Sequence, residues 1–300
     1  MKKTARNAVI WTLITAKLLS SEPAIAQNIQ ESKQNLIENL EKEQQPIDSS
    51  ISKILENNKN TICYITNKET KVYSDNEWKQ VIWTIPAWTF IRKNNLKTGK
   101  ENEQFINCNF RGKEVWIPIN NLTEGNNNIT RELLKPKTEK AILVDKANRK
   151  IQVYGNYGTK LLKEFKTALS PWWEWDKIIE WDWNTPEGKY YICYKNPASA
   201  FWTNPKTGKR LWSLQVSYPN LQDAAEGLIA WDITKEQYQS IKSAVSKKGI
   251  PNQWTELWNY IMIHWGGNEY DWTAWCMGLS DEDMLWLYNN IWTGTDIFIW

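Results

Sequence analysis

Residues 261–279 read IMIHWGGNEYDWTAWCMGL, and this stretch decides the interpretation of the whole chain. It places His264 at the end of an apolar run and Cys276 twelve residues later, in a turn. The sequence of 300 residues contains one histidine. If a cysteine of this protein is a nucleophile activated by an imidazole, His264 must supply that imidazole.

The length and the first residues predict an exported protein with two domains. A chain of 300 residues exceeds one average domain and can bury a sizeable core. Residues 1–26 are typical of a secretory signal peptide, with a basic start, an apolar run over 8–19 and the cleavage site Ala24-Ile25-Ala26. The alternative is a buried or membrane-anchoring helix, but a run of about 12 residues is too short to cross a bilayer. We expect a location in the periplasm or cell envelope, and no membrane span in the mature chain.

The charge balance gives no indication of nucleic-acid binding. The chain has 37 basic and 34 acidic residues, and the first 26 residues hold four of the basic ones and one acid. The remaining chain therefore carries 33 of each sign. A basic patch is the usual electrostatic sign of a nucleic-acid partner, and none is predicted here.

The cysteine pattern argues against a metal site. Cys63, Cys108, Cys193 and Cys276 form no CxxC pair, and a single histidine makes structural zinc a poor fit, so we expect no metal and no cofactor. In an oxidising compartment Cys63 and Cys108 either form a disulfide or remain two buried thiols. Cys193 lies in an apolar run and is interpreted as a residue of a core strand.

The first half of the mature chain has three parts. Residues 27–60 are polar, with scattered Ile and Leu at partly helical spacing, and are interpreted as a spacer broken near Pro46. Residues 61–123 contain six short β-prone runs separated by turns, which predicts a small barrel. The runs cover 62–65, 71–73, 80–82, 89–91, 105–108 and 115–118. Residues 124–138 are interpreted as a linker.

Residues 139–300 predict a second, β-rich domain. A hairpin is expected over 141–145 and 150–154, and the clearest helix over 234–247, where apolar residues recur at three- and four-residue steps. Ser280 is a plausible N-cap of a shorter helix. Further strands are expected at 165–170, 189–194, 214–219, 260–264 and 296–299. The predicted fold class is mainly β, a β-rich α+β arrangement of mixed sheet with short helices.

Tryptophan is much more frequent in this chain than in an average protein, and glycine is less frequent. The chain has 21 Trp and 13 Gly, and many of the Trp stand among turn-forming residues, where a chain usually needs glycine. One hypothesis is that these positions are glycine in the native protein, because its source reads UGA as glycine while the translation used tryptophan. The alternative is a truly Trp-rich surface that stacks on carbohydrate.

Two segments resemble known families. Residues 61–123 resemble bacterial SH3-like domains, with Ile85-Pro86-Ala87-Trp88-Thr89 in the place of a Pro-x-Gly-Thr turn. Residues 139–300 resemble the YkuD-type L,D-transpeptidase catalytic domain in four motifs. These are the signature DWNTPEGKY at 182–190, SYPN at 217–220, HWGG at 264–267 and DWTAWC at 271–276, the last as in one subgroup of the family.

The departures from the family follow a pattern. Tryptophan replaces the family's glycine at 88, 175, 181, 183, 265 and 275, whereas Trp116 and Trp272 fall where the family has tryptophan. Because tryptophan replaces glycine selectively, misreading of UGA codons explains the pattern better than accumulated substitutions do. Ala274 and Gly278 stand where most members have His and Arg, which leaves the donor or acceptor preference open.

The resemblance implies a thiol mechanism on peptidoglycan. Cys276 would attack a stem peptide to form a thioester, and His264 would deprotonate the second stem's amine or a water. Backbone N–H groups around 274–276 would bind the oxyanion, at about 3 kcal/mol per donor. The expected oxyanion and substrate-binding residues are Thr273, Ala274, Trp275, Gly266, Gly267 and Tyr218.

The resemblance leaves the reaction and the role of the barrel open. The expected partners are the donor and acceptor stem peptides, which a transpeptidase would cross-link. The alternatives are hydrolysis as an L,D-carboxypeptidase or endopeptidase, or a non-catalytic wall-binding protein in which Trp275 blocks the site. The barrel either contacts cell-wall glycan or peptide, or serves as a spacer domain.

Overall fold

The computed structural model describes residues 46–300 except 58–61, 76, 78, 93–95, 97–103, 126–131, 199–211 and 258–259. The predicted signal peptide and the spacer up to residue 45 lie outside the described residues. None of the described helices combines the length and the apolar character needed to cross a membrane.

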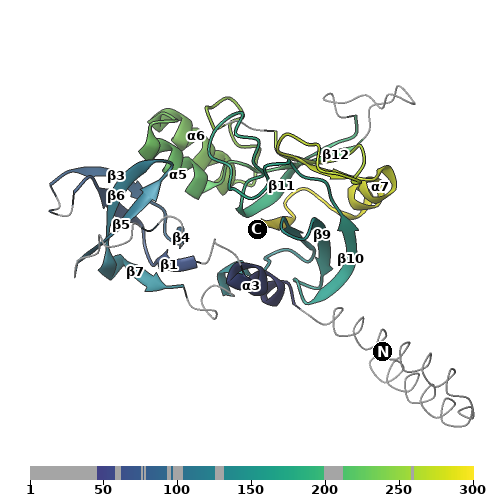
Figure 1. Cartoon of the computed structure of the whole chain (residues 1–300), viewed down its shortest axis with the longest axis horizontal. Helices are drawn as coiled ribbons and strands as arrows, with labels where there is room; N and C mark the ends of the chain where they lie inside the picture. Colours follow the sequence, from purple (N-terminus) through teal and green to yellow (C-terminus); the bar gives the residue numbers. More distant parts are fainter. Residues whose placement is uncertain are drawn as a thin grey trace, which may run out of the picture. The chain divides into compact units, whose positions relative to one another are not determined.

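The first module is a small all-β unit made of two sheets (Figure 1). All six predicted strands are present, each within a few residues of its expected position, and a short seventh strand follows them. One sheet has the order β4-β1-β7 and the other β3-β2-β6-β5. The strands are β1 (Ile62–Thr66), β2 (Thr70–Tyr73), β3 (Val81–Ile85), β4 (Phe90–Arg92), β5 (Phe105–Phe110), β6 (Lys113–Pro118) and β7 (Leu122–Glu124).

The second module is built on one mixed sheet of eight strands in the order β10-β9-β8-β15-β11-β12-β13-β14. Two neighbouring pairs are parallel, β15 with β8 and β13 with β14, and the others are antiparallel. The strands are β8 (Ala141–Asp145), β9 (Lys150–Gly155), β10 (Lys160–Lys166), β11 (Gly188–Asn196), β12 (Ser213–Val216), β13 (Met262–Trp265), β14 (Met277–Leu279) and β15 (Asp296–Ile299). The predicted hairpin is confirmed by the β8–β9 pair, in which Ala141 faces Tyr154. The fold is therefore mainly β, as expected.

Three capped helices accompany this sheet. The two predicted ones are confirmed: α6 (Lys235–Ser246) begins with a capping box at Thr234, and α7 (Asp281–Asn290) with Ser280 as N-cap. The sequence analysis missed α5 (Leu221–Ala230), which a capping box at Asn220 begins. Figure 1 shows α5 beside the small barrel, where it contacts β3 and β5.

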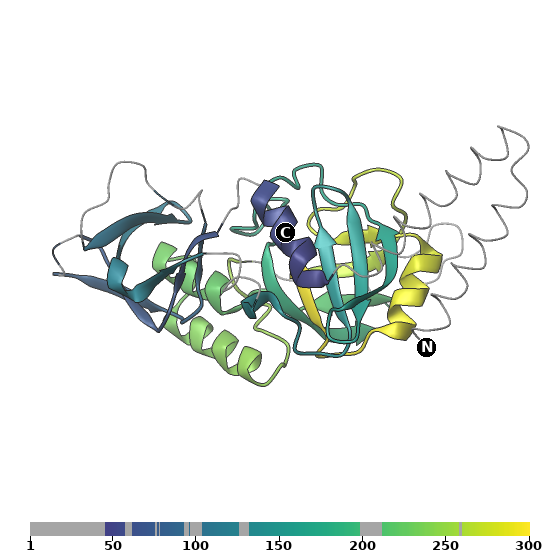
Figure 2. The ribbon, with the colours of Figure 1, turned by 90° about the horizontal axis from the view of Figure 1, so that it is seen from below.

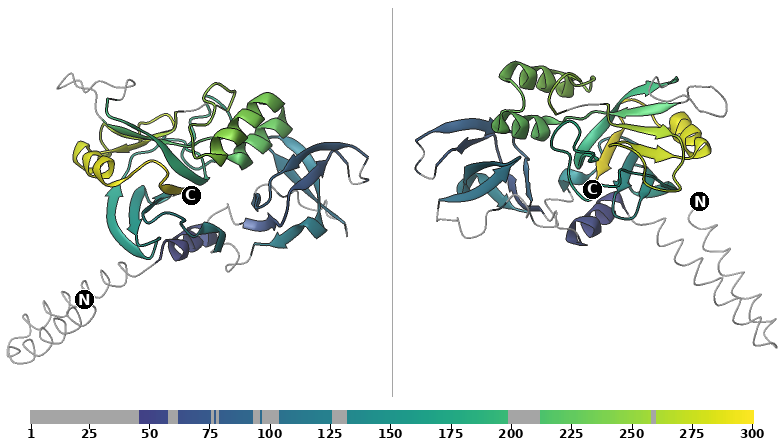
Figure 3. Two further views of the ribbon diagram at one scale, coloured as in Figure 1. Left: turned by 180° about the vertical axis from the view of Figure 1, so that it is seen from behind. Right: turned by 45° about the horizontal axis from the view of Figure 1, so that its top comes forward.

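The interpretation of residues 27–60 as a spacer is wrong for its last part. Residues 47–57 form helix α3, which lies along the β8–β9 side of the sheet (Figure 2). Ile47 and Ile51 are almost fully buried and pack in one cluster with Leu143, Tyr154 and Phe298. Apolar residues at i and i+4 lie on one face of a helix, and this face of α3 packs on the second module (Figure 3).

The predicted linker is also packed in part. Leu134 is fully buried in the same cluster as Ile51, while residues 126–131 lie outside the described residues. All four cysteines are thiols, so the alternative of a Cys63–Cys108 disulfide is not realised. Cys193 lies in β11 and is buried, as predicted.

Several tryptophans have a backbone conformation that suits glycine. Ten described residues other than glycine have φ between 50° and 71°, and four of them are Trp88, Trp181, Trp183 and Trp231. Trp231 is the left-handed residue that ends α5, a position that glycine usually occupies. These four side chains are 45–78% exposed, so packing does not explain their conformation. Trp175, Trp265 and Trp275 are not among the residues with positive φ.

This conformation predicts that Trp231→Gly stabilises the protein. A left-handed L-residue costs about 1–2 kcal/mol, which exceeds the extra entropy that glycine loses on folding. We expect the free energy of unfolding in urea to rise by about 0.5–1 kcal/mol. Trp254→Gly is the matched control, because Trp254 is 76% exposed and its φ is not positive. Equal effects of the two substitutions would contradict the strain argument.

Candidate active site

The pairing of β13 with β14 brings the predicted catalytic residues together. In this parallel pair His264 lies opposite Gly278, and Ile263 lies opposite Met277. Cys276 immediately precedes Met277 at the start of β14. The two residues of the opening stretch are therefore neighbours across one strand pair, and both are half-buried.

His264 is held as a neutral base. Its Nδ1 lies 2.6 Å from the carbonyl oxygen of Trp265. A carbonyl can only accept, so Nδ1 carries the proton and Nε2 keeps its lone pair. Burial lowers the pKa of His264, and the bond to the Trp265 carbonyl offsets this only in part. A backbone carbonyl thus orients the ring, and Trp272 packs edge-on against it with the ring centres 5.5 Å apart.

Cys276 is a neutral thiol that is hydrogen-bonded to the backbone. Its Sγ donates to the carbonyl oxygen of Tyr260 at 3.5 Å, and no hydrogen bond joins it to His264 within the described chain. Burial raises the pKa of Cys276 to about 12, while a backbone hydrogen bond at Met262 and the positive charge of Lys177 act in the opposite direction. The expected thiol–imidazole hydrogen bond is therefore not made among the described residues.

The turn before Cys276 is fixed by backbone and side-chain bonds. The Thr273 hydroxyl donates to the Cys276 carbonyl at 2.7 Å, and the Thr273 N–H donates to the Leu169 carbonyl at 3.1 Å. Thr273 is 2% exposed, so it shapes the turn and offers no surface to a substrate. Ala274 and Trp275 are half-buried beside it. The oxyanion role of the backbone at 274–276 stays a prediction.

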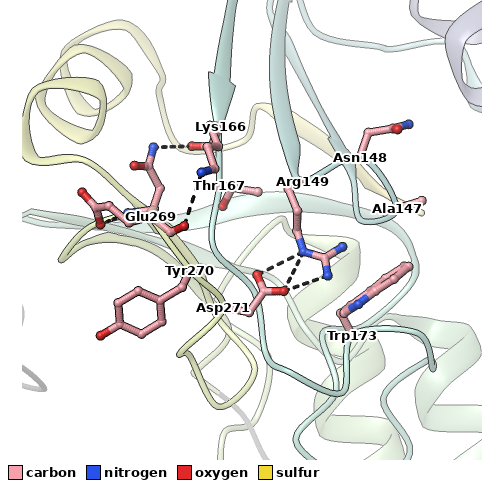
Figure 4. Close-up of a pocket in the computed structure, with 10 residues that line it drawn as sticks. Ala147, Asn148, Arg149, Lys166, Thr167, Trp173, Glu269, Tyr270 and Asp271 are labelled. Carbon is pink, nitrogen blue, oxygen red and sulfur yellow. Dashed lines mark hydrogen bonds and ion pairs between the residues drawn. The ribbon is translucent and has the colours of Figure 1, made fainter.

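Asp271 has a structural role. Figure 4 shows its carboxylate facing the guanidinium of Arg149, with Nε–Oδ2 at 2.8 Å and Nη2–Oδ2 at 2.7 Å. It also accepts from the Leu169 N–H at 2.9 Å. Burial alone would raise the pKa of Asp271, but the hydrogen bonds from Arg149 and Leu169 outweigh it and lower the pKa. Arg149 stacks over Trp173, with its guanidinium carbon 4.1 Å from the ring centre.

A pocket of about 510 Å³ lies at this ion pair (Figure 4). Arg149, Asp271 and Trp173 line it together with Lys166 and Tyr270, and the Tyr270 side chain is 72% exposed. The pocket meets the active turn at Asp271, and neither Cys276 nor His264 lines it.

Residues 176–187, here called the signature loop, lead into and include the start of the signature motif. They contact residues 273–276, here called the nucleophile turn. The hydroxyl of Thr185 donates to the carbonyl of Trp275 at 3.0 Å. Lys177 is fully buried, pairs with Asp182 at 2.9 Å and lies 5.4 Å from the Trp275 ring centre. Burial lowers the pKa of Lys177, and Asp182 opposes that shift. No role was predicted from the sequence for Lys177, which precedes the motif 182–190, or for Thr185 within it.

Two predicted glycines are needed for backbone reasons. Gly266 and Gly267 have φ of 130° and 107°, a region that side chains rarely adopt. A Cβ at Gly266 would lie 2.8 Å from the Trp272 ring, and one at Gly267 would lie 2.6 Å from the Glu269 carboxylate. They let the chain turn after His264, and a substrate contact by either one stays a prediction.

Tyr218 lies apart from the surface of the site. Its side chain is fully buried and packs against Tyr190, with the ring centres 6.1 Å apart. It therefore presents no exposed atom to a substrate in this structure, and its predicted contact finds no support here. The position follows β12, and the hydroxyl of the buried Ser217 before it accepts from the Tyr191 N–H at 2.9 Å.

The second module is a mixed sheet in which the β13–β14 pair brings one imidazole, of His264, near one thiol, of Cys276. The family model of the L,D-transpeptidase catalytic domain, YkuD, matches residues 139–299, which is more than half of the chain. The protein belongs to this family. No curated protein sequence matches the chain.

Solved structures similar to this one share little sequence with it. The helical cell shape determining protein Pgp2 from Campylobacter jejuni is 18% identical, with 55% of this chain and 48% of that chain covered and a TM-score of 0.35. Bd1075 from Bdellovibrio bacteriovorus is 20% identical over 55% and 50%, with a TM-score of 0.32. An L,D-transpeptidase from Mycobacterium smegmatis is 11% identical over 69% and 82%, with a TM-score of 0.31. The chain spans about half the length of Pgp2 and of Bd1075.

The neutral thiol predicts how Cys276 reacts with iodoacetamide. The thiolate is the reactive form, so a raised pKa makes the alkylation rate rise about tenfold per pH unit between pH 7 and 10. Peptide mass spectrometry at residue 276 measures the rate, and His264→Gln should leave the slope unchanged. A rate that already levels off below pH 7 would show a preformed thiolate–imidazolium pair instead.

Proposed function

We propose that the protein is a peptidoglycan L,D-transpeptidase that works through a thioester on Cys276. The observation that carries the proposal is the strand pairing that holds His264, with an unprotonated Nε2, beside the start of β14. A neutral imidazole next to a thiol is the pair that nucleophilic acyl transfer requires. The family of residues 139–299 supplies the substrate class.

The reaction follows from these two residues. Cys276 Sγ leaves the Tyr260 carbonyl, gives its proton to His264 Nε2 and attacks the carbonyl carbon of the diamino acid in the donor stem. A C–S bond forms, the C–N bond to the terminal D-amino acid breaks, and the departing amine takes the proton from His264. The amine of the acceptor stem then attacks the thioester, with His264 as its base. The new amide forms, and the thiol regains its proton.

Water in place of the acceptor amine gives the second candidate, hydrolysis. The acyl-enzyme and both catalytic residues are the same, so the products distinguish the two reactions. A third possibility is a wall-binding protein without activity, in which the indole of Trp275 fills the acyl site. Trp275 is half-buried and lies edge-on to Trp181, with the ring centres 5.7 Å apart.

The same proposal includes glycine at several tryptophan positions. The φ values of 61–71° support glycine at 88, 181, 183 and 231. At 175, 265 and 275 the proposal rests on the family resemblance alone. Trp272 differs, because its ring packs on His264 and its Nε1 donates to the Gly267 carbonyl at 3.2 Å.

Codon usage tests the glycine proposal. The gene should have UGA at 88, 181, 183 and 231 and UGG at 116 and 272, and peptides of the native protein should have glycine masses at the first four. UGG at all six positions, or tryptophan masses throughout, would refute it.

The proposed setting is the cell envelope. Export through residues 1–26 would deliver the enzyme to its substrate, and an SH3-like barrel would contact wall glycan or peptide. The described strands β1–β7 are compatible with such a barrel.

The products of a disaccharide-tetrapeptide donor test the function. With an acceptor stem we expect a cross-linked dimer by mass, and Cys276→Ala should abolish every product. His264→Gln should lower the rate by about 10²- to 10⁴-fold, because a positioned general base contributes that much. A shortened monomer alone would indicate hydrolysis. No product from the wild type, with either tryptophan or glycine at 265 and 275, would contradict enzymatic activity.

A further inference from the structure

One arginine of the small barrel enters the catalytic module. Arg92 is the last residue of β4, and its side chain is 6% exposed. Its Nη1 lies 2.6 Å from Asp176 Oδ2 and 3.4 Å from Glu187 Oε2, and its Nη2 donates to the Glu187 carbonyl at 3.1 Å. A residue of the first module thus makes three polar contacts to a loop of the second.

The rest of β4 docks on the same module. The N–H of Phe90 donates to the side-chain oxygen of Gln222 at 3.0 Å, and the Gln222 amide donates back to the Phe90 carbonyl at 3.1 Å. The Arg92 guanidinium also lies 5.2 Å from the Trp300 ring centre. These contacts join the two modules beside Arg92 but do not involve the loop that Arg92 reaches.

The two carboxylates stand at the two ends of the signature loop, residues 176–187. The N–H of Glu187 donates to Asp176 Oδ1 at 2.7 Å, which closes the loop at its base. Lys146 reinforces the closure, because its Nζ lies 2.9 Å from each of three oxygens: Glu187 Oε1, the Thr185 carbonyl and the Trp175 carbonyl. Arg92 therefore holds the base of a closed loop.

The signature loop contacts Trp275, the residue that precedes the nucleophile. Lys177 directly follows Asp176 and is the cation nearest the Trp275 ring among the described contacts, at 5.4 Å. Thr185, two residues before Glu187, donates to the Trp275 carbonyl at 3.0 Å. Trp275 precedes Cys276, so the path from Arg92 to the nucleophile passes through one loop and two contacts.

We propose that Arg92 is a positioning residue of the active site, which sets the signature loop against the nucleophile turn from the neighbouring module. This inference rests on the proposed transpeptidase function. It gives the barrel a role in the reaction itself, in addition to any contact with the wall. The planar guanidinium is suited to this role, because it bonds two carboxylates and a carbonyl at once, which an ammonium group on a lysine cannot do with the same geometry.

Three variants test the proposal. Arg92→Met removes the contacts and leaves Glu187 with Lys146, Arg92→Lys keeps the charge, and Asp176→Asn removes the partner. Gln222→Met is the matched control, because it breaks two hydrogen bonds between the same modules without touching the loop. Thermal unfolding of all four variants separates folding from activity.

We expect Arg92→Met to lower kcat/KM for the tetrapeptide donor by about 10- to 100-fold, mainly through kcat, since a misplacement of about 1 Å at a reacting group has effects of this size. Arg92→Lys should recover part of the loss, and Asp176→Asn should add little in the Arg92→Met background. The Arg92→Met substitution should also change the rate of iodoacetamide alkylation at Cys276, a reading that needs no substrate. Gln222→Met should change neither kinetic measurement.

The outcomes separate the two claims. If the wild type has no activity, the proposed function fails, and the alkylation rates still decide the role of Arg92. If the wild type is active and Arg92→Met matches Gln222→Met in kcat, KM and alkylation, the positioning role is refuted. Should Arg92→Met not fold, Arg92→Lys and Asp176→Asn give the same comparison.

Discussion

The parallel pairing of β13 with β14 is the constraint on which the site depends. Hydrogen bonds between two paired strands fix the position of one backbone relative to the other. Here the register places His264 opposite Gly278, which is two residues after Cys276. The ten residues between Trp265 and Cys276 must then turn back within a short distance. Gly266 and Gly267 supply the unusual φ values, and Asp271 anchors the returning segment to Arg149 and Leu169.

A layer of buried charge supports this strand pair. Arg92, Lys146, Lys177, Asp182 and Glu187 all have side chains that are at most 12% exposed, and each has an opposite charge within 3.4 Å. Removal of one partner from a buried pair costs about 3–5 kcal/mol, because the remaining charge stays out of water. Such groups resist displacement, so they fix the loop that contacts the nucleophile turn. The layer includes Arg92 of the barrel, so buried ion pairs join the two modules.

Sequence periodicity predicted the elements whose patterns are local. The hairpin of β8 and β9, the helix α6 and the N-cap Ser280 follow from alternation, from three- and four-residue steps and from capping chemistry. Helix α5 was missed, although Asn220 and Asp223 form a readable capping box. Helix α3 was taken for a spacer because its composition is polar, and only the contacts of Ile47 and Ile51 show that it is packed.

The residues of the candidate site could be predicted from the sequence, but their side-chain contacts and burial could not. The family motifs led to His264 and Cys276, and the structure places His264 on β13 and Cys276 directly before the paired strand β14. No pattern in the chain shows that Cys276 points to Tyr260, that Tyr218 is buried, or that Arg92 reaches Asp176 across 84 positions of sequence. These features arise from tertiary packing. The turn context of Trp88, Trp181 and Trp183 did indicate glycine, and their φ values of 61–66° agree.

The central claim is that Cys276 forms a thioester with the stem peptide. Intact-protein mass spectrometry after brief incubation with a tetrapeptide donor, quenched in acid without acceptor, measures this species directly. The account predicts a protein heavier by the tripeptide acyl group, an adduct that hydroxylamine removes and that Cys276→Ala lacks. An active protein that never carries the adduct, or the same adduct on Cys276→Ala, would contradict it.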